Sequence, residues 1–255
     1  MAGNFRSNET DRAKVISEQL EDTGYGELYR DYITYLKLRS VGRRKEAMAS
    51  ANKFISAFAN DPFEARFAVG LHLVRVTEPY WEHWPYCDSW LIPGNISSKF
   101  LVPIWQGFRE RHPKDPEAWL YGFGVLDGLE TAFLLDKQNI AYQYAHLNGL
   151  IGYLDYALHE FPSFGMVLEG PREFAEFVKS IEFVVLAMGE NFTDLGKLTY
   201  ETAAEFANKF SAFGKNSPDF RSHLVAIGRQ DLIGFPIYEA QSWFKELPPL
   251  IRKTR

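Results

Sequence analysis

A short phrase that is typical of a helix start occurs twice in this sequence, each time between two helix-like segments. The first copy is residues 60–65, Asn-Asp-Pro-Phe-Glu-Ala, and the second is residues 114–119, Lys-Asp-Pro-Glu-Ala-Trp. Aspartate caps a first turn, proline suits the first helical position because its missing N–H would be unpaired there, and glutamate favours the positive end of the helix dipole. The repetition predicts stacked helical hairpins, an architecture used mainly for holding other molecules.

Large apolar residues recur at the three- and four-residue spacing of a helix face. The stripe after Gly42 consists of Ala47, Ala51, Phe54, Ile55 and Phe58. Two further faces are expected, Phe174, Phe177, Val178, Ile181 and Val185 on a helix over 171–188, and Ala203, Phe206, Ala207 and Phe210 on a helix over 199–213. Sustained alternation of apolar and polar residues is missing from the sequence, which therefore predicts an all-α protein with essentially no sheet.

Two segments resemble the tetratricopeptide repeat, a family of paired helices. Residues 42–48, Gly-Arg-Arg-Lys-Glu-Ala-Met, look like the tight turn and small-residue helix start of that repeat, and residues 112–119 look like the junction between two repeats. The small packing positions and the wedging aromatic of the family are matched by Ala47, Ala51, Ala118 and Trp119. The resemblance covers residues 27–75 and 98–161, and it implies a superhelical groove for peptides or proteins.

The sequence departs from the family pattern at three points. The helix after Gly42 is longer than in the family, Asp61 and Asp115 of the two phrases are 54 positions apart, and Phe123 stands where a glycine is expected. We therefore expect antiparallel helical hairpins stacked as an irregular α-α superhelix. The expected layout is a flexible arm over 1–10 and a single all-helical domain over 11–255, with repeat-like hairpins at 27–75 and 98–161, an aromatic connecting loop at 76–97 and C-terminal helices over 171–255.

Charge and cysteine content exclude several classes of function. The net charge of −5 argues against a nucleic-acid binder, which needs clustered Lys and Arg to displace counterions, and favours a neutral or basic partner. The single cysteine excludes an intrachain disulfide and suits a reducing compartment. The polar N-terminal segment and the lack of a long apolar run predict a cytoplasmic protein that does not insert in a membrane.

An aromatic segment with three prolines lies between the two repeat-like hairpins. Trp and Tyr are the residue types that dominate binding hot spots, and the candidate protein-binding residues are Tyr80, Trp81, Glu82, Trp84, Tyr86 and Trp90. The same rings would also suit a structural role, covering the gap between the hairpins. A mixed arrangement has Trp81 and Trp84 buried and Trp90 exposed.

Other chemistry-bearing residues are interpreted as structural. The acidic and imidazole groups that could be assembled into a metal or acid–base site are His72, Glu78, Glu82, His83 and Asp88, but Pro79 places Glu78 outside any helix that holds Glu82. Cys87 is read as a small buried hydrophobe rather than a nucleophile activated by His83.

Two further features have a structural reading. The glycines at 122, 124 and 128 lack the preceding strand of a dinucleotide motif and suit close helix packing. His146 and His159 lie among apolar residues and are expected to be core histidines with satisfied hydrogen bonds.

The sequence thus predicts a non-enzymatic protein-binding module, with no catalytic residue, metal or cofactor. An inhibitor or immunity-type protein that occludes a basic protein partner is one concrete form of it. The alternative is a metal-dependent enzyme or small-ligand binder in a helical bundle, using the Glu78–Asp88 segment. A third hypothesis is a self-associating structural protein, since the sequence leaves the oligomeric state open.

Overall fold

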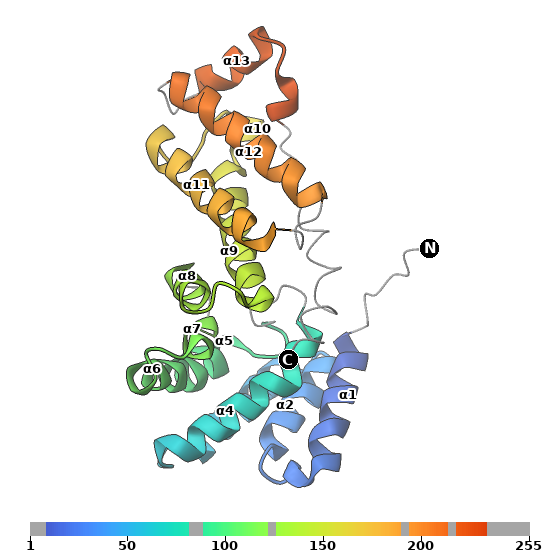
Figure 1. Cartoon of the computed structure of the whole chain (residues 1–255). Helices are drawn as coiled ribbons and strands as arrows, with labels where there is room; N and C mark the ends of the chain where they lie inside the picture. Colours follow the sequence, from blue (N-terminus) through green and yellow to red (C-terminus); the bar gives the residue numbers. More distant parts are fainter. Residues whose placement is uncertain (1–8, 82–88, 122–125, 190–193, 214–217, 234–255) are drawn as a thin grey trace. The chain divides into compact units, whose positions relative to one another are not determined.

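The computed structural model describes residues 9–81, 89–121, 126–189, 194–213 and 218–233, and these residues form helices and connecting turns without a strand (Figure 1). The prediction of an all-α protein is confirmed, whereas the tetratricopeptide-like identity of the repeats stays a prediction. The chain divides into two compact units, Met1–Val125 and Leu126–Arg255, where the sequence predicts one domain over 11–255. The boundary falls inside the second repeat-like segment, so each unit is described by itself.

Unit 1, Met1–Val125, is built from short helices around an aromatic core. Its elements are α1 (Glu9–Leu20), η1 (Glu21–Tyr25), α2 (Arg30–Ser40), α3 (Arg44–Ala57), α4 (Phe63–Thr77), η2 (Glu78–Tyr80), α5 (Gly94–Ile96), η3 (Ser97–Leu101), α6 (Val102–Arg111) and α7 (Pro116–Leu120). Helices α2 and α3 form a hairpin through a turn in which Gly42 has φ of +78°, a conformation that favours glycine.

The predicted stripe on α3 faces the core of unit 1. Ala47, Ala51, Phe54 and Phe58 are buried, and Ile55 is half-buried. The Phe54 ring stacks on Tyr29 and meets Phe100 edge-on, with ring centroids 5.8 and 5.4 Å apart. The helical periodicity of the sequence therefore identified the buried face of this hairpin correctly.

The two predicted helix starts differ in their caps. Helix α7 begins at Pro116, and the Asp115 carboxylate accepts a hydrogen bond from the Glu117 backbone N–H at 2.9 Å, as the motif predicts. Helix α4 begins at Phe63 after Pro62, and its first turn carries no side-chain cap. The aspartate of the first phrase thus lies one residue too early to act as the cap.

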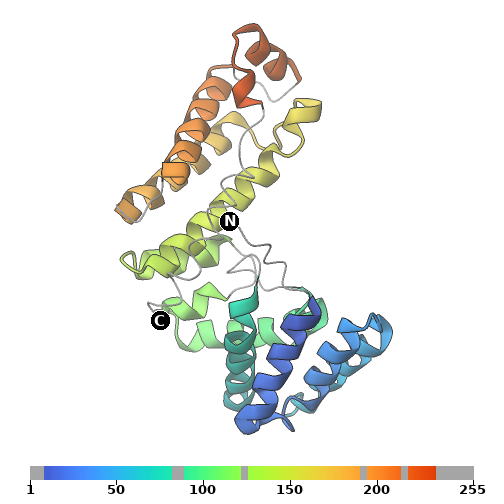
Figure 2. The same cartoon turned by 90° about the vertical axis from the view of Figure 1, so that its right-hand side faces the viewer.

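Unit 2, Leu126–Arg255, contains three long helices and several short ones. Its elements are α8 (Leu126–Leu135), α9 (Ile140–Leu158), α10 (Phe161–Phe164), α11 (Pro171–Met188), α12 (Asp194–Phe213), α13 (Pro218–Ala226) and η5 (Gln230–Leu232). Helix α9 packs against both α8 and α11, and α11 and α12 lie side by side in both views (Figures 1 and 2).

The predicted apolar faces of unit 2 meet its core. Phe174, Val178 and Ile181 of α11 are buried and Phe177 and Val185 are half-buried, while all four predicted α12 residues are buried. Phenylalanine rings from several helices pack together at one end of this core, where α10, α12 and α13 lie. The rings there are Phe161, Phe174, Phe206, Phe210 and Phe220.

Candidate functional site

The aromatic segment predicted as a binding site is largely packed into unit 1 where it is described. Trp81 and Trp90 are 6% and 7% exposed, and Tyr80 is half-buried. The arrangement in which Trp90 is exposed is therefore wrong. Glu82, Trp84 and Tyr86 lie outside the described residues, so their part in binding stays a prediction.

Two tyrosines of α2 explain the burial of Trp90. The Tyr35 hydroxyl donates to the Trp90 carbonyl at 2.5 Å, and the Tyr32 hydroxyl donates to the Leu91 carbonyl at 3.0 Å. The Arg39 guanidinium lies 6.0 Å from the centroid of the Trp90 ring. These contacts hold the end of the segment against α2, which sequence spacing alone did not indicate because the partners are more than 50 residues apart.

The start of the segment is held in a similar way. The backbone carbonyl of Tyr80 accepts a hydrogen bond from Arg12 at 3.1 Å, and the hydroxyl of Tyr80 accepts one from Gln19 at 3.4 Å. The Trp81 ring meets Tyr121 edge-on, with centroids 6.4 Å apart. Both ends of the segment thus take part in the packing of unit 1.

The candidate acid–base residues of unit 1 pair with tyrosines. Nδ1 of His72 lies 3.0 Å from the Tyr29 hydroxyl, which also donates to the Val69 carbonyl, and Glu78 accepts a hydrogen bond from Tyr121 at 3.1 Å. Burial lowers the pKa of His72 and raises the pKa of Tyr29. In the described part of the chain, no group of three or more His, Cys, Asp or Glu is arranged to hold a metal.

The remaining members of that predicted cluster, Glu82, His83 and Asp88, lie outside the described residues, as do Cys87 and the glycine pair at 122 and 124. The alternative that uses the Glu78–Asp88 segment therefore stays a prediction. His159, expected in the core, is exposed, and its Nδ1 lies 2.6 Å from the Tyr156 carbonyl.

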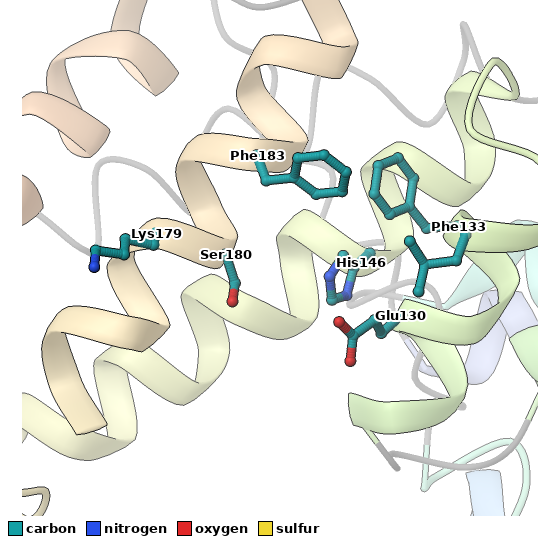
Figure 3. Close-up of a pocket in the computed structure, with 7 residues that line it drawn as sticks. Glu130, Phe133, His146, Lys179, Ser180 and Phe183 are labelled. Carbon is teal, nitrogen blue, oxygen red and sulfur yellow. The ribbon is translucent and has the colours of Figure 1, made fainter. Parts of the chain in front are cut away.

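A pocket of about 220 Å³ opens in unit 2 between α8, α9 and α11 (Figure 3). Residues of all three helices line it, namely Glu130, Phe133 and Leu134 of α8, His146 of α9, and Lys179, Ser180 and Phe183 of α11. The lining combines apolar with polar and charged side chains, and its Phe133 and Phe183 rings meet edge-on with centroids 5.7 Å apart. We refer to this cavity as the His146 pocket.

His146 is the most deeply buried polar group of the pocket. Its side chain is 3% exposed, and its ring stacks on Phe133 with centroids 5.6 Å apart. His146 therefore lies in the core as predicted, but its Nδ1 is sealed from solvent and makes no hydrogen bond with any described residue, contrary to the expectation of a satisfied histidine. Burial lowers the pKa of His146 to about 4, and the imidazole is therefore neutral at physiological pH.

The mouth of the pocket combines exposed apolar side chains with charges. Leu134 and Phe183 are 47% and 48% exposed, and Leu186, one turn beyond Phe183 on α11, is 73% exposed. We call these three residues the α8–α11 patch. Glu130 and Lys179 are exposed charged members of the lining, and Figure 3 shows Lys179 pointing away from the His146 ring. The Lys137 ammonium lies 5.2 Å from the centroid of the Phe183 ring.

A buried amide fixes the helices around this mouth. Nε2 of Gln143, three residues before His146, donates to the Lys137 carbonyl at 2.8 Å and to the Ala187 carbonyl at 3.2 Å. One side chain of α9 therefore ties the α8–α9 turn to the C-terminal turn of α11.

The sequence contains one signal for this surface, which lies outside the predicted apolar faces. Phe183 and Leu186 lie outside the predicted apolar face of α11, on the side where charged residues such as Lys179 and Glu182 also occur. Large apolar residues on the polar side of an amphipathic helix have no core to fill, which points to a surface contact. The missing partner of His146 had no comparable signal in the sequence.

No family model, curated protein or solved structure matches the chain. Among the described helices, none is long and apolar enough to cross a membrane.

Proposed function

We propose that this protein works by binding another protein without catalysing a reaction, and that the contact is made by the α8–α11 patch of unit 2. The observation that carries this proposal is the exposure of Leu134 and Phe183 at the pocket, together with that of Leu186 one turn further along α11. Exposing several large apolar side chains together is unfavourable in water, and such clusters mark surfaces that are covered by a partner. The tetratricopeptide-like phrases of the sequence support the same class of function.

The patch has the composition of a protein interface. Apolar and aromatic residues occupy its centre, while Glu130, Lys137 and Lys179 provide charges around it. Interfaces typically have an apolar centre that excludes water and a polar rim that sets orientation and partner choice. The pocket adds a cavity in which an anchoring side chain of the partner can be buried.

The overall charge narrows the choice of partner. With a net charge of −5, the protein attracts neutral or basic proteins more strongly than acidic ones, and repels nucleic acid. Occlusion of a basic partner's active cleft, as by an inhibitor or immunity-type protein, is the concrete form that we favour. The single cysteine suits action in a reducing compartment such as the cytoplasm.

Site-specific crosslinking in cells of the source organism tests the proposal. A photoreactive phenylalanine analogue placed at position 183 should capture one defined protein, and Leu186→Glu should reduce that capture at least tenfold. The matched control places the analogue at Phe164, which is 66% exposed but is not part of the α8–α11 patch, and should not capture the same protein.

Three outcomes would overturn the proposal. They are the absence of any crosslink at position 183, capture of the same protein from position 164, and capture that Leu186→Glu does not reduce. A crosslink to a second copy of this chain, together with a concentration-dependent mass in light scattering, would instead establish the self-associating class.

A further inference from the structure

We propose that the exposed turn between α2 and α3 of unit 1 binds an acidic segment of a protein. The turn and the start of α3 carry Arg43, Arg44 and Lys45, and the apolar residues Val41 and Met48 precede and follow these cations in the sequence. We call these five residues the basic turn. This surface goes beyond the proposed function, which concerns the α8–α11 patch of unit 2.

Positive charge is concentrated around this turn. Residues 37–53 contain six Lys and Arg residues and one acidic residue, Glu46, whereas acidic residues outnumber basic ones by 33 to 28 in the whole chain. Arg43, Arg44 and Lys45 are all exposed. The Arg43 guanidinium pairs with Glu46 at 3.1 Å, while Arg44 and Lys45 form no ion pair with a described residue. The basic turn therefore presents positive charge that no described carboxylate balances.

Helix stability does not explain the cations that follow the turn. Arg44 and Lys45 occupy the first two positions of α3, and Arg43 precedes them. The first turn of a helix carries a partial positive charge and favours acidic side chains, so cations are unfavourable there. Lys37 and Arg39 differ, because they lie in the last turn of α2, where positive charge is favourable. The fold thus accounts for the cations before the turn and gives those after it no stabilising role.

Two apolar side chains accompany the cations. Val41 is 68% exposed in the connection between the helices, where glycine and small polar residues are usual. A hydrogen bond from the Arg43 N–H to the Leu38 carbonyl at 2.9 Å closes the connection, so Val41 protrudes from a defined turn. Met48, one helical turn after Arg44, is 37% exposed, and methionine adapts its shape to a partner. A bound segment can therefore combine ion pairs with apolar contacts.

The surroundings of the basic turn favour a short acidic segment over an extended polyanion. Charges in solution are screened beyond about 8 Å at physiological salt, so a short segment interacts mainly with the basic turn. A membrane surface or a nucleic acid is larger and also meets the rest of a protein whose net charge is −5. Asp and Glu side chains pair with the arginine fork in two parallel hydrogen bonds. Neighbouring apolar side chains of the segment would cover Val41 and Met48, which a phosphate backbone cannot do.

Binding of defined peptides to the full-length protein tests the charge preference. The probes are fluorescent peptides in which leucine alternates with pairs of acidic residues, of Gln and Asn, or of Lys and Arg. We expect the acidic peptide to bind about tenfold more tightly than the neutral one, and its affinity should fall as salt is raised. Equal affinity for the acidic and neutral peptides, or a preference for the basic one, would overturn the proposal.

Charge reversal at the turn separates binding from stability. Arg44→Glu combined with Lys45→Glu should weaken binding of the acidic peptide about tenfold. The same double variant should keep or raise the midpoint of thermal unfolding, because glutamate suits the start of a helix. A lower midpoint with unchanged peptide binding would assign these cations to stability and contradict the site.

The matched control reverses two lysines elsewhere in unit 1. Lys99→Glu combined with Lys114→Glu makes the same change in net charge at exposed positions outside the basic turn. This control should change the affinity for the acidic peptide by less than about twofold, since distant charges are screened. Equal weakening by the two double variants would show an effect of net charge alone and exclude a local site.

Competing anions test the assignment to a protein segment. The probes are vesicles that contain phosphatidylserine and a single-stranded oligonucleotide, each compared with the acidic peptide at the same salt concentration. The peptide should bind more tightly than either. Tighter binding of the vesicles or the oligonucleotide, lost in the Arg44→Glu, Lys45→Glu variant, would replace the protein segment with that partner class.

Crosslinking identifies the natural source of the segment. A photoreactive phenylalanine analogue at position 41, in cells of the source organism, should label a peptide rich in Asp and Glu, and the turn variant should lose this crosslink. Labelling of a peptide without acidic residues, or a crosslink that survives the variant, would contradict the inference. A missing crosslink at position 183 defeats the proposed function alone, because that position lies in unit 2.

Discussion

The imidazole of His146 stacks on the ring of Phe133, with the centroids 5.6 Å apart and the ring planes inclined by 22°. The contact covers one face of the imidazole with an apolar ring while Nδ1 is sealed from solvent without a hydrogen bond. The surroundings therefore offer a proton little stabilisation, and the neutral ring is the form that the fold accommodates. Both the chemistry of the pocket and the response of the protein to acid follow from this relationship.

His146 should make the protein less stable as the pH falls. Its pKa is about 4 in the folded state and near the ordinary 6.5 in the unfolded chain, so the unfolded state takes up the proton first. The stability is fully present above pH 6.5 and is lost as the pH falls from 6.5 towards 4. Between pH 7.5 and pH 5 the loss from this group should be about 2 kcal/mol.

Urea unfolding of the wild type and of His146→Phe at both pH values measures this contribution. The lowered pKa of His72 acts in the same direction and is present in both proteins, so the difference between their pH slopes isolates His146. The lining carboxylate Glu130 is likewise common to both. Identical pH slopes would show that His146 is not protonated on unfolding in this range.

Two glycines of unit 2 should respond to alanine in opposite directions. Gly189 ends α11 with φ of +52° and ψ of −122°, a conformation that strains any residue with a Cβ, so Gly189→Ala should cost about 1–3 kcal/mol. Gly152 is exposed within α9 and a Cβ there meets open space, so Gly152→Ala should add about 0.4–1 kcal/mol. Thermal unfolding of both variants checks the signs, and a neutral or stabilising Gly189→Ala would contradict this backbone geometry.

The two Asp-Pro phrases should differ in their contribution to stability. Asp115 accepts the Glu117 N–H at the start of α7, so Asp115→Ala should cost about 1 kcal/mol. Asp61 precedes Pro62 and makes no such cap at α4, so Asp61→Ala should change the stability by less than about 0.5 kcal/mol. Urea unfolding of the two variants distinguishes them, and equal losses would mean that the sequence motif caps both helices.

The contrast between these two phrases shows how far the sequence predicts this fold. Periodicity found the buried faces of α3, α11 and α12 because a helix face depends on spacing within one segment. The cap at Asp61 could not be decided, since a shift of one residue in the helix start removes the hydrogen bond. The His146 pocket was missed because it arises where three helices meet, and the lack of a partner for one nitrogen depends on all of them.

The burial of Trp90 leads to the last prediction, which separates stability from binding in the aromatic segment. The Trp90 ring is 7% exposed, and its removal in Trp90→Ala should leave a cavity and cost about 3–5 kcal/mol. The backbone carbonyl of residue 90, which accepts a hydrogen bond from the Tyr35 hydroxyl, is kept in this variant. Phe164→Ala removes an exposed ring and should cost less than about 1 kcal/mol.

Urea unfolding measures both free energies. A small loss of stability for Trp90→Ala would contradict the burial of that ring and would again allow it to be a binding residue. If Trp90→Ala loses the expected stability, part of the variant is unfolded. Weaker partner binding by this variant must then be corrected for the unfolded fraction before it shows that Trp90 contacts the partner. Variants of Leu186 need little such correction, because this side chain is 73% exposed, and variants of Phe183, which is 48% exposed, need less correction than Trp90→Ala. The α8–α11 patch is therefore the surface on which a binding experiment can be interpreted directly.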